Sequence, residues 1–431
     1  MTNSASSMIT EVRILLLATS LLLGLSPAVA EVTALVGATV HPVAAEPIED
    51  GIVLIENGRI QAVGADLAVP TQATVIELDG LHLYPGFVHP ATQLGLTEIS
   101  SVAGSVDTSE MGSINAALRA EVAVNHDSAL LPVAISGGVL SAHIMPGGGL
   151  IRGSSAVLRL DGWSWEEMIL QTPTAMHLAF PAGAASDEDN DDLALIDETL
   201  EQARHWHAAE VAAARGDAPR PARNDQLEAL GPLLAGEVPL MIHANGIAVI
   251  EAALDWAEDQ GFEQIILSAN ADVQYAAERL AAERIPVVLR GVYNMPVRRW
   301  EAYDMAYVAA ARLHQAGVLF AIGDSGGGMD VANARNLPFH AGSAAAHGLP
   351  KDAALRSVTL WPAEILGVAD QLGSIEAGKR ATLFASTGDP LEPMTRIRRV
   401  WIDGVEYDLM HDRHRQLYER YRRHQQGTVA E

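Results

Sequence analysis

The sequence predicts an α/β fold, a closed (β/α)8 barrel joined to a small β-domain built from both ends of the chain. Between about residues 85 and 366, apolar runs of strand length alternate with helical patterns, which is typical of parallel strands with helical crossovers. Residues 31–84 and 367–411 contain short strands and turns instead. The 431 residues suffice for one large domain and a smaller one, and the number of strand–helix units favours a closed barrel over an open sheet.

The first thirty residues predict a secretory signal, followed by the fold from residue 31. Arg13 precedes the apolar run 14–25, and Ala28-Val29-Ala30 supplies small residues for cleavage after Ala30. The run is short for a bilayer span, so a membrane anchor is the second interpretation. We therefore expect a periplasmic or secreted protein that has no membrane partner once the signal is cleaved.

Composition excludes several classes of function. The net charge is −26, from 28 basic and 54 acidic residues. The chain therefore lacks the excess of positive charge that neutralises nucleic-acid phosphates, and we expect no nucleic-acid partner. There is no cysteine, which excludes disulfides, a thiol nucleophile and a cysteine-based zinc site. The stability of the fold must therefore come from its core.

The β-domain is predicted from turn signals between apolar runs. Asn57-Gly58 separates the runs 52–55 and 60–63, and this pair is a strong signal for a tight hairpin because both residues accept a positive φ. Asp403-Gly404 gives a second hairpin near the end of the chain. Neither terminal piece alone could bury both of its faces, so we expect the tail to pair with the N-terminal strands.

The barrel strands are predicted from buried apolar runs, each followed by a helical pattern. A long helix is expected around residues 194–216, and a basic helix in the tail at 412–426 either docks on the acidic body or is solvated. The clearest strands cover residues 238–245, 263–270, 285–291 and 318–324.

Four segments carry a resemblance to a known family. Residues 79–96 (DGLHLYPGFVHPATQLGL) look like a first barrel strand, and residues 239–245 (PLMIHAN) like a strand that offers one metal-binding histidine. The most specific match is 333–392, which begins NARNLPFHAGS and ends STGDPLE, and 401–409 (WIDGVEYDL) looks like a closing strand. On these residues the chain resembles the amidohydrolase superfamily, in particular its imidazolonepropionase-like exported members.

The resemblance implies a metal-dependent TIM-like barrel with a β-sandwich formed from both chain ends. The boundaries that follow are a signal at 1–30, sandwich at 31–84 and 367–411, barrel at 85–366 and a helical tail at 412–431. In this family, metals at the barrel mouth lower the pKa of a bound water so that hydroxide is available near neutral pH. An aspartate after the last strand moves the proton to the leaving nitrogen.

The metal site that the resemblance implies is degenerate in this sequence. Ala91 and Gln93 stand in place of the two strand-one histidines, while His243 matches the strand-five histidine. The strand-six segment offers Ser268, Asn270 and Asp272 but no histidine. Because a site normally needs three protein ligands plus water, the expectation is one divalent metal, zinc first, or none.

Five residues are the candidates for the site. Asp324 is the candidate catalytic base, with a turn cap as the other interpretation, and His243 is the candidate metal ligand, with a satisfied core histidine as the other. The candidates for substrate binding are Gln93 as polar lining, and Glu98 and His126 from a long polar loop between strands.

These residues predict a hydrolase of non-peptide carbon–nitrogen bonds that acts through a reduced or rebuilt metal and water site. Small cyclic amides, N-blocked amino acids or dipeptides are the expected substrates. The alternative is a non-catalytic protein that binds a ligand, or a subunit that partners an active relative in a homo- or hetero-oligomer. Metal-free hydrolysis through Glu98, Glu110 or Asp324 is a third interpretation.

Overall fold

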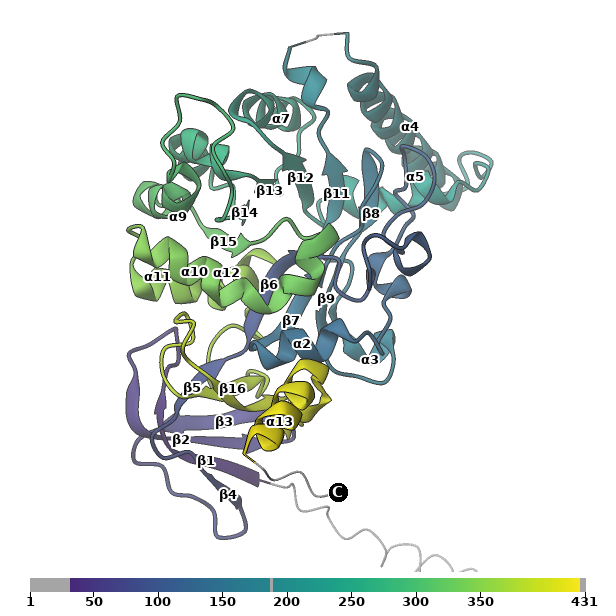
Figure 1. The fold of residues 1–431 in the computed structure, drawn as a ribbon. Coiled ribbons are helices and arrows are strands. Elements are labelled where there is room, and N and C mark those ends of the chain that lie inside the picture. The colour runs from purple at the N-terminus through teal and green to yellow at the C-terminus, as the bar shows by residue number, and fades with distance from the viewer. Residues whose placement is uncertain (1–31, 187–188, 427–431) are drawn as a thin grey trace, which may run out of the picture.

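The computed structural model describes residues 32–186 and 189–426. It contains a β-sheet built from both ends of the chain and, above it in Figure 1, a larger part in which parallel strands are surrounded by helices. The α/β class is confirmed. The predicted signal and its cleavage site lie outside the described residues.

The terminal sheet has eight strands in the order β18-β17-β16-β5-β1-β2-β3, with β4 paired to β1. Its own apolar core includes Leu35, Leu83 and Trp401. The strands are β1 (Val32–Val40), β2 (Ile48–Glu56), β3 (Arg59–Gly64), β4 (Thr74–Glu77), β5 (His82–Pro85), β16 (Leu383–Ser386), β17 (Ile397–Ile402) and β18 (Val405–Glu406).

Two tight turns fix the register of this sheet, as the sequence predicts. Asn57 and Gly58 have φ values of 52° and 77°, and Asp403 and Gly404 have 49° and 77°. Each pair joins antiparallel neighbours, β2 to β3 and β17 to β18. A Cβ on Gly58 would lie 2.7 Å from the carbonyl oxygen of Asp403, so the two turns pack directly on each other.

The two ends of the chain meet at β5 and β16, which pair antiparallel with Leu383 opposite Pro85. The strands of both ends therefore form one hydrogen-bonded sheet. Strand pairing gives one sheet, and the two-layer arrangement and the domain boundaries stay predictions.

The larger part contains two sheets. One has four strands in the order β10-β9-β7-β6, and the other has six in the order β15-β14-β13-β12-β11-β8. Strands β11 to β15 are parallel, as are β6 and β7. The strands are β6 (Phe87–Thr92), β7 (Val139–Ile144), β8 (Ile151–Ser154), β9 (Ala156–Arg159), β10 (Ile169–Gln171), β11 (Met176–Ala179), β12 (Leu240–Ala244), β13 (Ile265–Ala269), β14 (Val287–Arg290) and β15 (Phe320–Gly323).

No continuous ladder closes these strands into a ring within the described residues, so closure of the barrel stays a prediction. At the junction of β6 and β15, the N–H groups of Val88 and Ile322 donate to the carbonyls of Val358 and Ser357. The backbone of a helical connection thus takes the bonds that a β6–β15 ladder would use. At the other junction the chain itself crosses from β8 to β9 through Ser155.

Helices cover the outside of the parallel strands (Figure 1). The predicted long helix is α4, and none of the helices within the described ranges has both the length and the apolar character that a bilayer crossing requires. The helices are α2 (Leu130–Ser136), α3 (Trp165–Met168), α4 (Asp191–Ala214), α5 (Asp225–Ala229), α6 (Gly231–Leu234), α7 (Ile247–Asp259), α8 (Ala277–Glu283), α9 (Met305–Ala316), α10 (Leu337–Ala346), α11 (Lys351–Arg356), α12 (Leu360–Ile365) and α13 (Arg413–Gln425).

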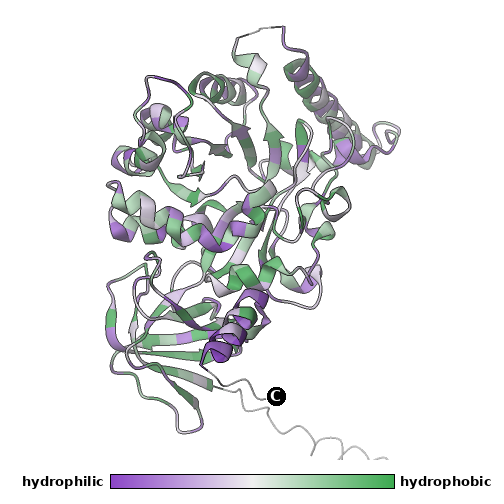
Figure 2. Cartoon of the chain, viewed as in Figure 1, coloured by the Kyte–Doolittle hydropathy of each residue, from purple (hydrophilic) through white to green (hydrophobic). Residues whose placement is uncertain are grey.

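Short 3-10 helices occupy several connections, and one of them, η5, leads from the end of β15 to α10. They are η1 (Ala103–Ser105), η2 (Ala120–Ala123), η3 (Ala182–Ala185), η4 (Ala271–Ala276), η5 (Gly328–Asn336) and η6 (Leu409–His411). Figure 2 shows the strands mainly apolar and α13 strongly hydrophilic. Helix α13 has no buried residue, yet it contacts α2.

The long loop between β6 and α2 lies along the edge strand β8. The N–H of Asn115 donates to the carbonyl of Ile151, and Arg119 bridges to Ser154. Glu121 of this loop is fully buried and accepts from Arg119 at 2.7 Å and from Thr172 at 2.9 Å. The loop therefore extends the sheet edge.

Replacing Phe384 with alanine tests the joint between the terminal sheet and the rest of the fold. Its ring is fully buried, with centroids 5.6 Å from Tyr84 and 5.0 Å from Phe87. Phe384→Ala is expected to lower the free energy of unfolding by about 3–5 kcal/mol, measured by urea denaturation, because it leaves a cavity. Val405→Ala is the control, since Val405 is 71% exposed. Equal losses in the two variants would contradict the assignment of Phe384 to a core joint.

Candidate functional site

A cavity of about 630 Å³ opens where β12, β13, β14 and β15 end, and we call it the mouth cavity. The carboxyl ends of parallel strands are the usual place for sites in α/β folds. Each of the four strands contributes a polar residue at or just after its end. These residues are Asn245, Asn270, Arg290 and Asp324, and η5 and α10 complete the wall with Asp330, Asn333, Asn336 and His340.

Asp324 is held by two contacts. Its Oδ2 lies 3.2 Å from Nε2 of the fully buried His89 on β6, and its Oδ1 accepts the N–H of Gly326 at 2.7 Å. Burial alone would raise the pKa of Asp324, but the charge and hydrogen bond of His89, with the Gly326 N–H, lower it below its ordinary value. Asp324 is thus an ionised carboxylate that caps a turn, and its catalytic role stays a prediction.

Three histidines, on β7, β11 and β12, form a row of ring contacts between the two sheets. His143 on β7 has Nδ1 2.8 Å from the carbonyl oxygen of Pro90 and Nε2 2.6 Å from Ser155 Oγ. Since a carbonyl only accepts, Nδ1 carries the proton and Nε2 accepts from the serine. His177 Nδ1 on β11 lies 2.9 Å from His243 Nε2 on β12, so one of these rings donates to the other.

All three histidines are neutral. Burial lowers the pKa of His143 to about 4 and lowers that of His177 well below its ordinary value. Burial also lowers the pKa of His243, and His177, Arg152 and Arg290 lower it further by charge repulsion. The three histidine rings are therefore uncharged, and the positive charge beside them comes from Arg152 and Arg290.

Arg152 on β8 and Arg290 on β14 are these two cations. Burial, followed by repulsion from Arg152, lowers the pKa of Arg290 to about 10, so it still carries its charge at neutral pH. Arg290 Nη2 donates to Asn245 Oδ1 at 2.8 Å, and neither arginine has an ion pair with a described residue.

Several buried polar atoms around these cations lack a hydrogen-bond partner among the described residues. Because nearly all such atoms in folded proteins are satisfied by protein, water or ligand, their gathering in one place marks a site that takes polar molecules. They are Nε of Arg152 and of Arg290, Nε2 of His177, Nδ1 of His243 and Oγ of Ser268, which lies opposite His243 on β13.

These residues do not fit a divalent metal. Among the described residues, no three histidine, aspartate or glutamate side chains converge on one point. His243 contacts one histidine ring directly, that of His177, and charge repulsion from His177, Arg152, Arg290 and His143 adds to the lowering of its pKa by burial. A catalytic metal normally needs three protein ligands, and the neighbouring guanidinium charges would repel it.

His340 on α10 is a further titratable group of the mouth cavity. Its ring contacts that of Tyr293 at a tilt of 50° with centroids 4.4 Å apart, and its Nδ1 is buried without a partner among the described residues. Burial lowers the pKa of His340, while the charge of Asp324 opposes that shift. His340 is therefore neutral at pH 7, with a carboxylate near enough to stabilise its protonated form.

The structure brings together only part of the predicted set. Asp324 lines the mouth cavity, whereas His243 is buried beside Arg290 and does not line it. The side-chain amide of Gln93 packs between Gly147 and Gly327, so closely that a Cβ on either glycine would clash with it.

The two candidates from the long loop lie elsewhere. Glu98 accepts from Asn125 at 3.3 Å, and exposed His126 lies 6.2 Å from the ring of Trp163. Neither residue lines the mouth cavity, and the backbone of this loop pairs with β8. The substrate-binding roles of Gln93, Glu98 and His126 stay predictions.

Sequence reasoning missed His143, His177, Arg290 and His340. The first two are histidines inside otherwise apolar runs, and Arg290 ends one; a polar residue in a buried strand was the signal that could have indicated them. His340 lies on an ordinary helix, and no sequence pattern marks it.

The buried histidines predict a loss of stability in mild acid. His143 binds a proton less readily in the folded state, with a pKa of about 4, than in the unfolded state, with a pKa of 6.5. The unfolded state therefore takes up more protons as the pH falls from about 6.5 towards 4, and the free energy of unfolding falls over that window.

His143→Gln is expected to remove about 2 kcal/mol of the stability difference between pH 7 and pH 5, measured by urea denaturation. Only the difference between the two pH values is compared, so a general destabilisation cancels. The exposed His205→Gln is the control. An unchanged pH dependence in His143→Gln would show that His143 is already protonated in the fold.

Comparison with known proteins agrees with this architecture. Residues 243–406 match the sequence family described as the amidohydrolase family. The chain is 26% identical over 393 residues to amidohydrolase tasK of Hapsidospora irregularis, which covers 82% of this chain and 39% of that protein. The chain thus spans well under half the length of this curated relative.

Solved structures give the same result. An amidohydrolase from Thermotoga maritima superposes with a TM-score of 0.80 at 26% identity, covering 87% of this chain and 99% of that one. An adenosine deaminase from Xanthomonas campestris with bound zinc has a TM-score of 0.51 at 20% identity, covering 90% and 98%, and shows the fold alone.

The barrel-like arrangement of strands, the family match over residues 243–406 and the structural neighbour from Thermotoga maritima together support placing this chain in the amidohydrolase superfamily.

Proposed function

We propose that this protein is a hydrolase that cleaves a carbon–nitrogen bond of a small anionic substrate in the mouth cavity, using its own side chains to activate water. The observation that carries the proposal is the composition of the cavity wall. Neutral His340, ionised Asp324 and cationic Arg290 line the same space of about 630 Å³, a size suited to a small molecule. The likeness to amidohydrolases supports the bond type.

The three side chains have complementary tasks in this proposal. His340 takes a proton from water, whose oxygen attacks the carbonyl carbon of the substrate. Asp324 stabilises the resulting imidazolium by its charge, as the opposing effect on the pKa of His340 indicates. The carbon–nitrogen bond then breaks and the imidazolium returns the proton to the leaving nitrogen. No step requires a metal.

Arg290 defines the class of substrate. A half-buried guanidinium without an ion pair among the described residues is suited to a carboxylate, which it can bind with two parallel hydrogen bonds. Arg152 adds positive potential from behind the histidine pair. N-blocked amino acids, dipeptides and carboxylated cyclic amides combine the bond and the charge that this site requires.

The narrower sequence expectations belong to the same proposal. They are an imidazolonepropionase-like relationship, a degenerate metal site at Ala91, Gln93 and His243, a β-sandwich, export by a cleaved signal to the periplasm or outside the cell, and an oligomer with itself or a related amidohydrolase. Ser268 opposite His243, where the resemblance implies a histidine, supports the degenerate site.

A non-catalytic role is the second candidate. It is supported by the engagement of both carboxylate oxygens of Asp324, which leaves the expected general base tied to His89 and Gly326. In that case the mouth cavity binds an anionic ligand without cleaving it. Binding without turnover across the substrate panel below would favour this role.

The first prediction concerns the two cavity residues. With N-acetyl amino acids, dipeptides and carboxylated hydantoins as the panel and amine release as the readout, His340→Gln is expected to lower kcat about 10²–10⁴-fold. Arg290→Gln is expected to raise KM about 10–100-fold, because one charged hydrogen-bonded contact is lost. His205→Gln and Arg299→Gln, both exposed and outside the cavity, are the controls. If kcat stays unchanged in His340→Gln, the assigned base is wrong.

The second prediction concerns metal. Dialysis against 1,10-phenanthroline, followed by addition of zinc, is expected to leave both the rate and the melting temperature unchanged, since the described residues offer no three-ligand set. Elemental analysis of the dialysed protein accompanies the assay. About one equivalent of metal per chain, lost in His243→Ala together with activity, would replace this proposal with a rebuilt mononuclear site.

A further inference from the structure

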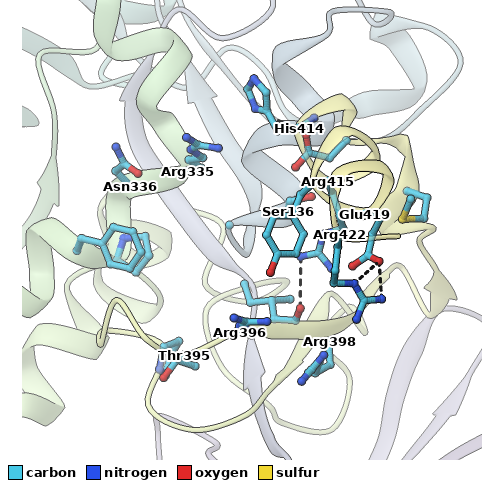
Figure 3. A pocket seen from close by; sticks show the side chains of 18 of the residues that line it. Ser136, Arg335, Asn336, Thr395, Arg396, Arg398, His414, Arg415, Glu419 and Arg422 are labelled. Atoms are coloured by element: carbon cyan, nitrogen blue, oxygen red, sulfur yellow. Dashed lines mark hydrogen bonds and ion pairs between the residues drawn. The ribbon is translucent and has the colours of Figure 1, made fainter. Parts of the chain in front are cut away.

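A second cavity, of about 830 Å³, adjoins the mouth cavity at Asn336, which lines both, and we call it the basic pocket. Helix α13 and strand β17 form one side, and the end of α2 with η5 and the start of α10 form the other (Figure 3). Segments that are far apart in the sequence thus line the same cavity. Nothing in the proposed hydrolase chemistry uses it.

The wall of the basic pocket carries a concentration of positive charge. It contains two carboxylates, Asp412 and Glu419, in a protein whose net charge is −26. The basic side chains of the wall are Arg335, Arg396, Arg398, His414, Arg415, Arg422 and Arg423.

Both carboxylates already have partners on α13. Asp412 is buried and its Oδ1 accepts the N–H of His414 at 2.8 Å, which caps the start of the helix. Glu419 Oε2 pairs with Arg422 at 2.6 Å, as the dashed lines in Figure 3 show. Neither carboxylate is left to neutralise the arginines on the other walls.

Three arginines of the wall have side chains with no hydrogen bond or ion pair to a described residue: Arg335, Arg396 and Arg398. A fourth, Arg415, makes only a long contact of 3.4 Å to the carbonyl of Ile397, and burial lowers its pKa. The Oγ of Ser136, at the end of α2, is buried in this wall without a partner. These groups are donors that face one cavity from four elements, η5, β17, α13 and α2.

Because the chain has an excess of acidic residues, arginines without a carboxylate partner point to a ligand that is itself anionic. Arginines on an acidic protein readily find carboxylates, and like charges that share a cavity repel one another. Planar guanidinium groups bind phosphate and carboxylate in pairs of hydrogen bonds. A small molecule with several anionic groups would neutralise the arginines and satisfy their donors at once.

We propose that the basic pocket binds a small soluble polyanion that carries two or more phosphate or carboxylate groups. The enclosed volume is in the range of small-molecule sites. The net charge of −26 opposes adsorption to an anionic membrane, so a soluble ligand is favoured over a lipid headgroup. This inference is independent of the hydrolase proposal.

Calorimetry with pyrophosphate and with citrate at low ionic strength tests the proposal on the full chain. The variant Arg396→Gln/Arg398→Gln is expected to weaken binding at least about tenfold, because it removes two charged donors. The control Arg413→Gln/Arg420→Gln removes the same charge from exposed positions of α13 that do not line the pocket, and is expected to bind like the wild type. All four arginines are exposed, so melting temperatures should agree.

Three results would overturn the proposal. Wild-type protein that binds neither pyrophosphate nor citrate has no polyanion site, and equal weakening in the two double variants would reduce the effect to net charge. Co-sedimentation with phosphatidylglycerol vesicles, without binding of either soluble anion, would assign the arginines to a membrane surface. Since binding is measured directly, loss of hydrolytic activity does not enter the result.

Discussion

The buried contact between His89 and Asp324 is the constraint on which the rest of the site depends. It joins β6, the first strand of the barrel-like part, to the end of β15, the last one, where no β-ladder connects the two strands. Breaking a buried pair of this kind typically destabilises a protein by about 3–5 kcal/mol. The contact also directs the turn at Gly326, from which η5 leads on to α10 and His340.

This constraint changes the chemistry of the mouth. In a metal hydrolase, an aspartate at this position and a set of histidines supply lone pairs to a cation. Here the aspartate is bonded to a histidine and a backbone N–H, and the next histidines bond to each other. Arg152 and Arg290 lie near enough to His243 to lower its pKa by charge repulsion. Arg290 lines the mouth cavity together with Asp272, Asp324 and Asp330, and its charge is the local feature suited to the carboxylate of the proposed substrates.

Much of the fold could be predicted from the sequence, and the reasons are local. Asn57-Gly58 and Asp403-Gly404 need positive φ, so their hairpins follow from residue type alone. Closure of the barrel is not a local property, so it does not follow from residue type in the same way. The residues that interrupt the ladder, Ser357 and Val358, lie in a helical connection and have no pattern of their own. Strand alternation predicts parallel pairing but not whether the last strand reaches the first.

The site was less predictable than the fold for a related physical reason. The resemblance selected Asp324 and His243 by position, yet it could not show that their partners would be His89 and His177. Arg152 and Arg290 come from strands far apart in the chain, and only folding brings their charges together. The polar loop that contains Glu98 and His126 was expected to bind substrate from its polar composition, and composition did not indicate that its backbone would pair with β8.

The pairing of β5 with β16 bears on how the protein is made. Leu383 and Pro85 face each other although they are about 300 residues apart, so this pair forms only when nearly the whole chain has been synthesised. Until then one edge of β5 remains unpaired beside an apolar core. An unfinished chain thus exposes a strand edge of the kind that pairs with other chains until its own C-terminal strands have been synthesised.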